Sequence, residues 1–304
     1  MRAASALLAL LLVLTGCVGG AGAARSGVVV TTNILGDITR NVVGAEAEVT
    51  VLMKPNANPH SFGISAQEAA RLESAGLVVY NGLGLEEGVL RNVRTAAESG
   101  VPTLPVGEQV DPIRFGDAAT NDMAGQADPH FWTDPERVRA AVRAIADRVT
   151  EHVDGVDERV IRANAARYLG ELEALHDDMS AEFGRIPAER RRLVTNHHVF
   201  GYLARRYDFD VLGAVIPSGT TLASPSASDL KSLADTIRRA GVRTVFADSA
   251  QPDRLARVLA EQAGLRVEVV PLFSESLTEP GQGAATYLEM MRANTEAIAD
   301  GLVG

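Results

Sequence analysis

Short runs of β-branched and other apolar residues alternate with amphipathic stretches along most of the chain. The runs have the length of buried strands, and the stretches carry apolar residues every three or four positions, as helices packed on a sheet do. In the first half the predicted strands are 27–31, 48–53, 77–81 and 103–106, and the predicted helices lie near 34–43, 65–75 and 85–98. This alternation predicts an α/β fold with mostly parallel sheets flanked by helices.

The second half of the chain repeats the pattern. Its predicted strands are 193–195, 211–215, 243–247 and 267–270, and its predicted helices are 199–207, 226–240, 252–263 and 284–301. A further helix is predicted from the cap Thr133-Asp134-Pro135-Glu136 to about His152. The two halves therefore resemble each other in the order of their elements.

One long amphipathic pattern separates the two halves. Apolar residues recur at helical spacing at Ile161, Ala165, Tyr168, Leu172, Leu175, Met179 and Phe183. The spacing predicts one helix from about 157 to 184, roughly 40 Å long. We expect residues 154–187 to form a rigid backbone helix that joins two α/β domains, 27–153 and 188–304.

The N-terminus has the pattern of a targeting segment. Arg2 precedes an apolar run that is too short to span a bilayer, and the run ends in Leu14-Thr15-Gly16-Cys17, which matches a bacterial lipobox. We expect residues 1–16 to be a lipoprotein signal peptide and residues 17–26, rich in Gly and Ala, to be a flexible tether. Lipidation of Cys17 would anchor the chain to the cell membrane on its periplasmic or outer face.

Composition narrows the function classes. The chain has 29 Lys and Arg against 39 Asp and Glu, a formal net charge of −10, and no basic stripe interleaved with aromatic residues. These features argue against nucleic-acid binding. Because Cys17 is the only cysteine, a disulfide within the chain is impossible and a thiolate zinc site is disfavoured.

Four predicted loops that follow strands each offer one metal-competent side chain: His60, His130, His197 and Glu275. Open α/β sheets bind ligands at the carboxyl ends of their strands, so these side chains could share one site. Two alternatives stay open from the residues alone, because His198 adjoins His197 and Asp248 also follows a strand. We interpret His152 and His176, which fall on helices, as ordinary surface residues.

The donor set indicates the kind of metal and of site. Imidazole suits zinc, and a carboxylate neutralises part of its charge, whereas harder oxygen donors suit manganese. A site closed by four protein ligands is typical of binding, while a catalytic zinc keeps an open position. The chain has no His-Glu-x-x-His motif and no Gly-x-Ser-x-Gly elbow, which disfavours a zinc hydrolase.

These motifs together resemble the zinc/manganese solute-binding proteins of bacterial ABC importers, the cluster A-I family, over essentially the whole chain after the leader. The matching stretches are 55–62, 77–87, 128–135, 197–202, and 273–277 with 287–291. The resemblance implies two α/β domains with metal in the cleft between them, held by His60, His130 and His197 rather than His198. The family's fourth ligand is usually aspartate, and the matching position here is Glu275.

The resemblance implies a function in metal import. We expect an extracytoplasmic, high-affinity zinc-binding protein, a monomer and not an enzyme, that delivers Zn2+ to a membrane permease and its ATPase. Residues 107–129 are acidic but lack the histidines of many zinc-type members, so the protein either binds free zinc or takes it from a metallochaperone. The alternatives are a manganese- or iron-binding protein of the same fold, a zinc hydrolase, and a surface adhesin.

Overall fold

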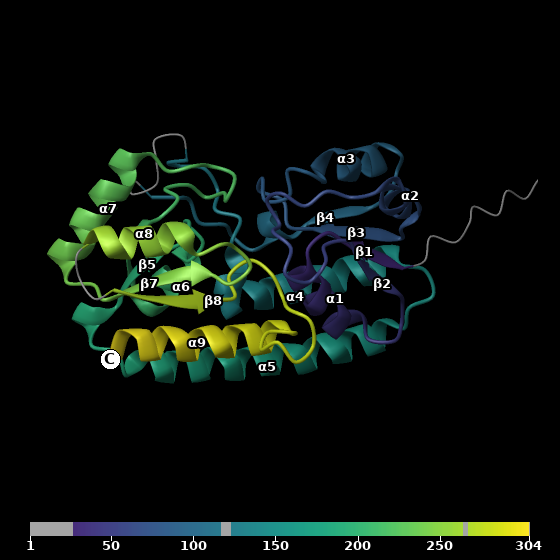
Figure 1. The fold of residues 1–304 in the computed structure, drawn as a ribbon. Helices are drawn as coiled ribbons and strands as arrows, with labels where there is room; N and C mark the ends of the chain where they lie inside the picture. Colours follow the sequence, from purple (N-terminus) through teal and green to yellow (C-terminus); the bar gives the residue numbers. More distant parts are fainter. Residues whose placement is uncertain (1–26, 117–122, 264–266, 304) are drawn as a thin grey trace, which may run out of the picture.

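The computed structural model describes residues 27–116, 123–263 and 267–303. The predicted signal peptide 1–16, the predicted tether 17–26 and the predicted lipid anchor Cys17 lie outside these ranges, so they stay predictions. The described chain forms two α/β halves with two long helices, α5 and α9, along one side (Figure 1).

The N-terminal half contains a four-stranded parallel sheet in the order β2-β1-β3-β4. Its strands are β1 (Val28–Val30), β2 (Val49–Val51), β3 (Leu77–Tyr80) and β4 (Thr103–Pro105). Its helices are α1 (Asn33–Val43), α2 (Ala66–Ser74), α3 (Leu90–Glu98) and α4 (Pro135–His152). Ser65 and Glu68 form a capping box at the start of α2, and the predicted Asp134 cap of α4 is present.

Alternate strand residues face the two layers of helices that cover this sheet. Val28 and Val30 lie in a core shared with α1 and α4, whereas Val29 lies in a second core shared with α2 and α3. Successive side chains of a strand point to opposite faces, so a run that is apolar at every position is buried on both sides. The apolar runs that predicted parallel strands are explained by this double burial.

The helix α5 (Glu158–Gly184) connects the halves and belongs to the core of both. Its seven periodic apolar residues are all buried: Ile161, Ala165, Tyr168, Leu172, Leu175, Met179 and Phe183. They share one hydrophobic core with residues of both halves, from Val28 to Ala299. In Figure 1, α5 runs beneath both lobes, and α9 (Tyr287–Val303) lies beside it on the C-terminal side. This helix is therefore a packed backbone of the molecule and not a free linker.

The C-terminal half has two parallel strand pairs, β5-β6 and β7-β8, and β5 lies beside β7. The strands are β5 (Arg192–Thr195), β6 (Asp210–Ala214), β7 (Thr244–Asp248) and β8 (Glu268–Leu272). The helices are α6 (Gly201–Tyr207), α7 (Ala227–Ala240), α8 (Arg254–Ala263) and α9. The strand residue Val194 faces α7 and α8, while Leu193 faces the core around α5.

The structure departs from the predicted elements mainly at short turns. Three short 3₁₀ helices were not predicted: η1 (Val106–Gln109), η2 (Phe131–Thr133) and η3 (Ala188–Arg190). The helix predicted from residue 85 begins only at Leu90, because the Glu86 carboxylate accepts the backbone N–H groups of Asn81 and Gly82 and folds this segment into a turn. A side-chain bond of this kind competes locally with the helix.

Candidate metal centre

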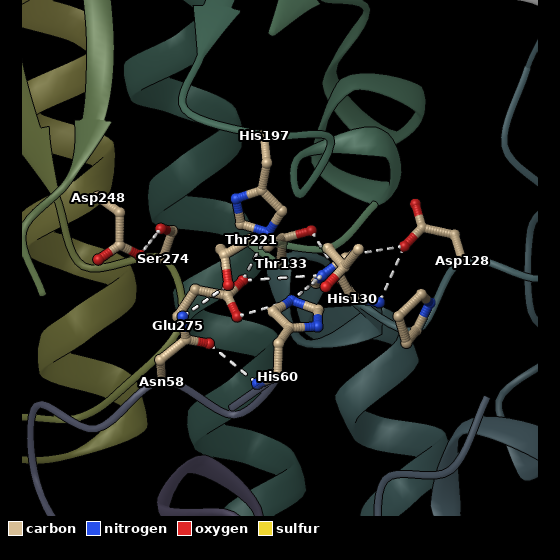
Figure 2. Close-up of polar contacts among 12 residues, drawn as sticks. Asn58, His60, Asp128, His130, Thr133, His197, Thr221, Asp248, Ser274 and Glu275 are labelled. Atoms are coloured by element: carbon tan, nitrogen blue, oxygen red, sulfur yellow. Dashed lines mark hydrogen bonds and ion pairs between the residues drawn. The ribbon is translucent and has the colours of Figure 1, made fainter. Parts of the chain in front are cut away.

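The structure brings together the four side chains that the sequence singled out. One ligand atom from each of His60, His130, His197 and Glu275 lies within 4.8 Å of the others, and all four residues are buried. They come from four loops, two in each half of the chain, and point toward a common centre (Figure 2). The sequence thus predicted which side chains meet, although that they bind a metal is a proposal argued below.

His60 is held by the geometry of its loop between β2 and α2. Asn58 Oδ1 accepts the backbone N–H of His60 at 2.9 Å. Asn56 adopts a left-handed conformation with φ of 59°, which asparagine tolerates better than most residues. Its backbone N–H donates to Leu277 O at 2.9 Å, so the His60 loop is tied to the loop that carries Glu275.

His130 is oriented by a carboxylate. Asp128 Oδ1 lies 2.8 Å from His130 Nδ1 and 2.9 Å from its backbone nitrogen. A proton on Nδ1 that is donated to Asp128 leaves Nε2, which faces the centre, free to bind a metal. Gly201 permits this arrangement, since a Cβ there would lie 2.8 Å from Asp128 Oδ2. Asp128 was not predicted as a supporting residue, although it lies two residues before His130 in the Asp-Pro-His sequence.

A buried carboxylate outside the donor set supports the same loop. Glu86 accepts hydrogen bonds from Thr31 Oγ1 at 2.7 Å and from the backbone of Asn81 at 2.6 Å. Asn81 Nδ2 in turn donates to Pro129 O at 3.0 Å, next to His130. Burial raises the pKa of Glu86, against the effect of these hydrogen bonds. The 77–87 motif therefore supports the loop that carries His130.

His197 follows the β5 strand and precedes α6. Its carbonyl accepts the Thr195 hydroxyl at 2.8 Å. The neighbouring His198 is not among the clustered ligand atoms of the described residues, and burial lowers its pKa to about 4. Of the two adjacent histidines, His197 is the one that faces the centre.

Glu275 follows β8 and is positioned by residues of the N-terminal half. Trp132 Nε1 donates to Ser274 O at 2.9 Å. Asn33 Nδ2 donates to Ser276 Oγ at 2.8 Å, and Asn33 Oδ1 accepts the Leu277 N–H at 3.0 Å. The backbone on both sides of Glu275 is thus fixed by side chains from the other half.

The single carboxylate of the centre lies close to all three imidazoles. The Glu275 oxygens lie 3.3 Å from His60 Nε2, 3.2 Å from His197 Nε2 and 3.7 Å from His130 Nε2. Burial alone would raise the pKa of Glu275, but His197 and His60 outweigh it and lower the pKa. Burial lowers the pKa of His60, which favours the neutral imidazole that binds metals.

Several buried atoms of the centre make no hydrogen bond of good geometry with any described residue. They are His197 Nδ1 and Nε2 and both Glu275 carboxylate oxygens, which approach the imidazole nitrogens only at ion-pair distance. Buried polar groups nearly always have partners, so such a group requires an explanation such as an ion. Three imidazoles and one carboxylate at these distances fit a divalent transition metal. The donor set and the orphaned atoms therefore suit a metal as the ligand.

Asp248, the rival acidic residue, is used differently. Its Oδ2 accepts the Ser274 hydroxyl and its Oδ1 accepts the Ala250 N–H at 2.7 Å. It is not in the cluster of ligand atoms found among the described residues, and it does not cap α8, which begins at Arg254. Burial, and then the nearby Glu275 charge, raise its pKa to about 6.

The remaining two histidines lie away from the centre. His152 ends α4, and His176 lies on α5 with its Nδ1 3.0 Å from the Tyr207 hydroxyl. Both residues are half-buried. The interpretation of them as ordinary surface residues is therefore only partly correct. Neither is part of the metal-competent cluster of the described residues.

Comparison with known proteins identifies the family. The profile of the family described as "Zinc-uptake complex component A periplasmic" matches residues 28–301. This range includes both halves of the chain and all four clustered side chains.

Curated relatives cover nearly the whole chain at low identity. A manganese ABC transporter substrate-binding lipoprotein, PsaA of Streptococcus mitis, is 27% identical over 300 residues, which is 96% of this chain and 95% of the relative. A metal ABC transporter substrate-binding lipoprotein, ScbA of Streptococcus cristatus, is 26% identical over 288 residues. These residues are 92% of this chain and 90% of the relative. Their shared description is substrate binding for metal transport.

Solved structures have the same fold. The periplasmic zinc-binding protein TroA of Treponema pallidum superposes with a TM-score of 0.83 at 26% identity, covering 91% of this chain and 99% of TroA. A manganese-bound periplasmic metal-binding protein of Candidatus Liberibacter asiaticus superposes with a TM-score of 0.80 at 24% identity. The match covers 91% of this chain and 100% of that protein's chain. The predicted α/β fold of two domains is confirmed by these likenesses.

The relatives also limit what the chain does. They are substrate-binding proteins of transporters and not enzymes, which answers the zinc hydrolase alternative. Among the described residues, no helix is long and apolar enough to cross a membrane. The chain belongs to the family of periplasmic zinc-uptake component A proteins and is a metal-binding component of an ABC transporter.

Proposed function

We propose that this protein binds Zn2+ with His60, His130, His197 and Glu275 and delivers it to a membrane permease that works with an ATPase. The observation that carries the proposal is the meeting of three buried imidazoles and one carboxylate with ligand atoms within 4.8 Å of one another. Zinc accepts such a set in tetrahedral geometry, with no further ligand needed.

The surroundings of Glu275 support a closed, four-coordinate site. A narrow void beside it is lined mainly by apolar residues, among them Leu35, Phe131 and Trp132, and has no room for a water molecule. Manganese prefers several oxygen ligands, including water, in octahedral geometry. Apolar residues without space for water beside the one carboxylate therefore favour zinc, which needs no water ligand.

Manganese is the second candidate, because PsaA of Streptococcus mitis is named a manganese transporter component. The TroA relative, in contrast, is titled a zinc-binding protein. We favour zinc because the third donor is the imidazole of His197, whereas a carboxylate there would suit manganese. For a given site, zinc also binds more tightly than manganese.

The domain limits and the location are parts of the same proposal. Domains 27–153 and 188–304 would each supply two ligands, and residues 154–187 would hold the domains together. Lipidated Cys17 would keep this monomeric protein at the outer face of the membrane, as the name lipoprotein indicates for the relatives. Zinc could arrive free or from a metallochaperone.

A competition titration tests the choice of metal. Metal-free protein, residues 18–304, is titrated with Zn2+ against a chromophoric chelator, with and without excess Mn2+. We expect one zinc per chain, held tightly and not displaced by manganese. Weak zinc binding, or ready displacement by manganese, would overturn the zinc proposal. A His197→Glu variant that gains manganese binding while losing zinc would support the donor argument.

A further inference from the structure

The segment 216–222, which follows β6, lies against the loops of the clustered histidines. We call it the cover segment. Its first contacts are on both sides of His197: the Ile216 N–H donates to Asn196 O at 2.8 Å, and Ser218 O accepts the His198 N–H at 2.9 Å. The position of His197 and the position of the cover segment are therefore linked through the backbone.

The middle of the cover segment closes over the His130 side of the centre. A Cβ on Gly219 would lie 2.4 Å from Phe115 Cζ and 2.5 Å from Met123 Cε, so a larger residue would require either these side chains or the segment to shift. The Phe115 ring is buried, and its centroid lies 6.4 Å from that of His130. Phe115 is thus packed between the cover segment and His130.

The end of the cover segment reaches the His60 loop through one side-chain pair. Asn58 Nδ2 donates to Thr221 Oγ1 at 2.6 Å, while Asn58 Oδ1 accepts the His60 N–H at 2.9 Å (Figure 2). One amide therefore connects the backbone of a candidate ligand in the N-terminal half with the cover segment of the C-terminal half.

This uncharged pair is weaker than the ion pair that also joins the halves. Asn58 and Thr221 are half-buried and uncharged, and the next residue, Leu222, is 52% exposed. Elsewhere, Arg206 of α6 holds the Asp134 carboxylate with two nitrogens at 3.0–3.1 Å. Bidentate pairs of this kind are stronger than a neutral hydrogen bond. Water can therefore compete more readily at the Asn58–Thr221 contact than at the Arg206–Asp134 ion pair.

We propose that Asn58 and Thr221 are positioning residues that form a latch across the cleft and set the rate of metal release. The proposal rests on the proposed function of the four-residue centre. While the latch is closed, the His60 loop is tied to the segment that is bonded on both sides of His197 and packs on Phe115 beside His130. Opening the latch frees the cover segment and lets the His60 loop move, with the donor set unchanged.

Release kinetics test the latch. Zinc-loaded protein is mixed with excess chelator in a stopped-flow instrument. Thr221→Val has nearly the same shape but no hydroxyl, and we expect release to become about threefold to tenfold faster, the effect of losing one neutral hydrogen bond. Thr221→Ser keeps the hydroxyl and should release zinc at the wild-type rate. Equal rates in Thr221→Val and the wild type would overturn the latch.

A double variant separates a latch from a general loss of packing. Asn58→Ala removes the same hydrogen bond together with the one that Asn58 accepts from the His60 N–H, so adding Thr221→Val to it should give little further acceleration. Fully additive effects would show that the two residues act independently and would contradict the proposal. If Thr221→Val does not fold, Gly219→Ala gives a second route, because its Cβ disturbs the contact of the cover segment with Phe115 and should also speed release.

Two further measurements keep this proposal distinct from the proposed metal site. His60→Ala should bind zinc far more weakly than the wild type, and wild-type affinity in this variant would refute the site itself. The visible absorption of bound Co2+ should be the same in Thr221→Val and the wild type, because the donors are unchanged. An altered spectrum would mean that Thr221 shapes the coordination, which contradicts a latch.

Discussion

At the scale of single residues, side chains outside the donor set decide how the donors face the centre. Asp128 selects which nitrogen of His130 is free, and Asn33 and Trp132 hold the backbone around Glu275. Ligand orientation by a second layer of hydrogen bonds is a general property of metal sites. The roles of these residues can each be tested by one substitution.

Asp128→Asn should weaken zinc binding about 10-fold to 100-fold, the usual effect of losing such a partner. The amide can no longer accept a charge-assisted bond from His130 Nδ1, so the imidazole is less basic and less well oriented. Chelator competition measures the affinity. Asp177→Asn, at an exposed position of α5, is the matched control and should bind as the wild type does. Unchanged affinity in Asp128→Asn would contradict the assigned role.

Asp248→Asn should remove a pH dependence from the stability of the metal-free protein. Because burial raises the pKa of Asp248 from 3.8 to about 6, the folded chain keeps this proton to higher pH than the unfolded chain does. The free energy of unfolding therefore falls as pH rises from about 4 to about 6, by at most about 3 kcal/mol. The stability difference between Asp248→Asn and the wild type should thus grow in favour of the variant between pH 4 and pH 8.

Urea unfolding at both pH values measures this difference. Asp253→Asn is the control, because the hydrogen bond from Arg257 lowers the pKa of the exposed Asp253. Its stability difference should change in the opposite direction, if at all. A difference for Asp248→Asn that is the same at both pH values would show that its carboxyl titrates as in the unfolded chain.

At the scale of elements, α5 carries the two halves because its apolar face is buried along its full length. The helix has 27 residues. Its packing on both halves stabilises it more than helix propensity alone does. Gly170, in its middle, is exposed, and nothing lies within 4 Å of where a Cβ would be. The glycine is tolerated by the packing around it and is not required there.

Gly170→Ala should therefore raise the free energy of unfolding by about 1 kcal/mol, the difference in helix propensity. Gly36→Ala in α1 is the contrasting variant, since its Cβ would lie 2.4 Å from Val51 Cγ2 and should destabilise the fold. Thermal or urea unfolding compares both with the wild type. If Gly170→Ala destabilised the protein, the helix would need a local flexibility that its packing does not indicate.

At the scale of the whole molecule, the centre joins loops from both halves, so a bound ion would hold the halves together. The donor loops are also joined directly, by the Asn56–Leu277 and Asn33–Ser276 hydrogen bonds. Metal binding and global stability should consequently be coupled. The coupling follows from mass action, because the unfolded chain lacks the assembled site.

Zinc should raise the stability of the whole chain in one transition. At free zinc about 1,000 times Kd, the gain should be about 4 kcal/mol, and chelation should reverse it. Differential scanning calorimetry measures the shift in both halves together. The His197→Ala variant is the control and should respond only weakly. A wild-type protein whose melting is unaffected by zinc, or in which only one half shifts, would contradict a site shared between the halves.

The sequence alone was sufficient for most of the elements and for the strand-end loops that meet at the centre, because both depend on short-range patterns. Apolar residues that recur every two positions, or every 3.6 positions on average, mark the buried face of a strand or helix, as residues 161–183 do for α5. Ligand-competent residues after parallel strands are brought to the same edge by the topology itself. The choice of His197 over His198 came from family resemblance, since both follow the same strand.

Tertiary structure decided what depends on contacts between distant segments. The contacts of Trp132 and Asn33 around Glu275, the Thr31–Glu86 hydrogen bond and the Asn58–Thr221 pair join residues far apart in sequence. Asp248 illustrates the limit: as a strand-end carboxylate it was a reasonable ligand, and only the packing of Ser274 against it shows that it faces another partner. Local sequence encodes which face of an element is buried, whereas three-dimensional packing decides which side chains meet across the cleft.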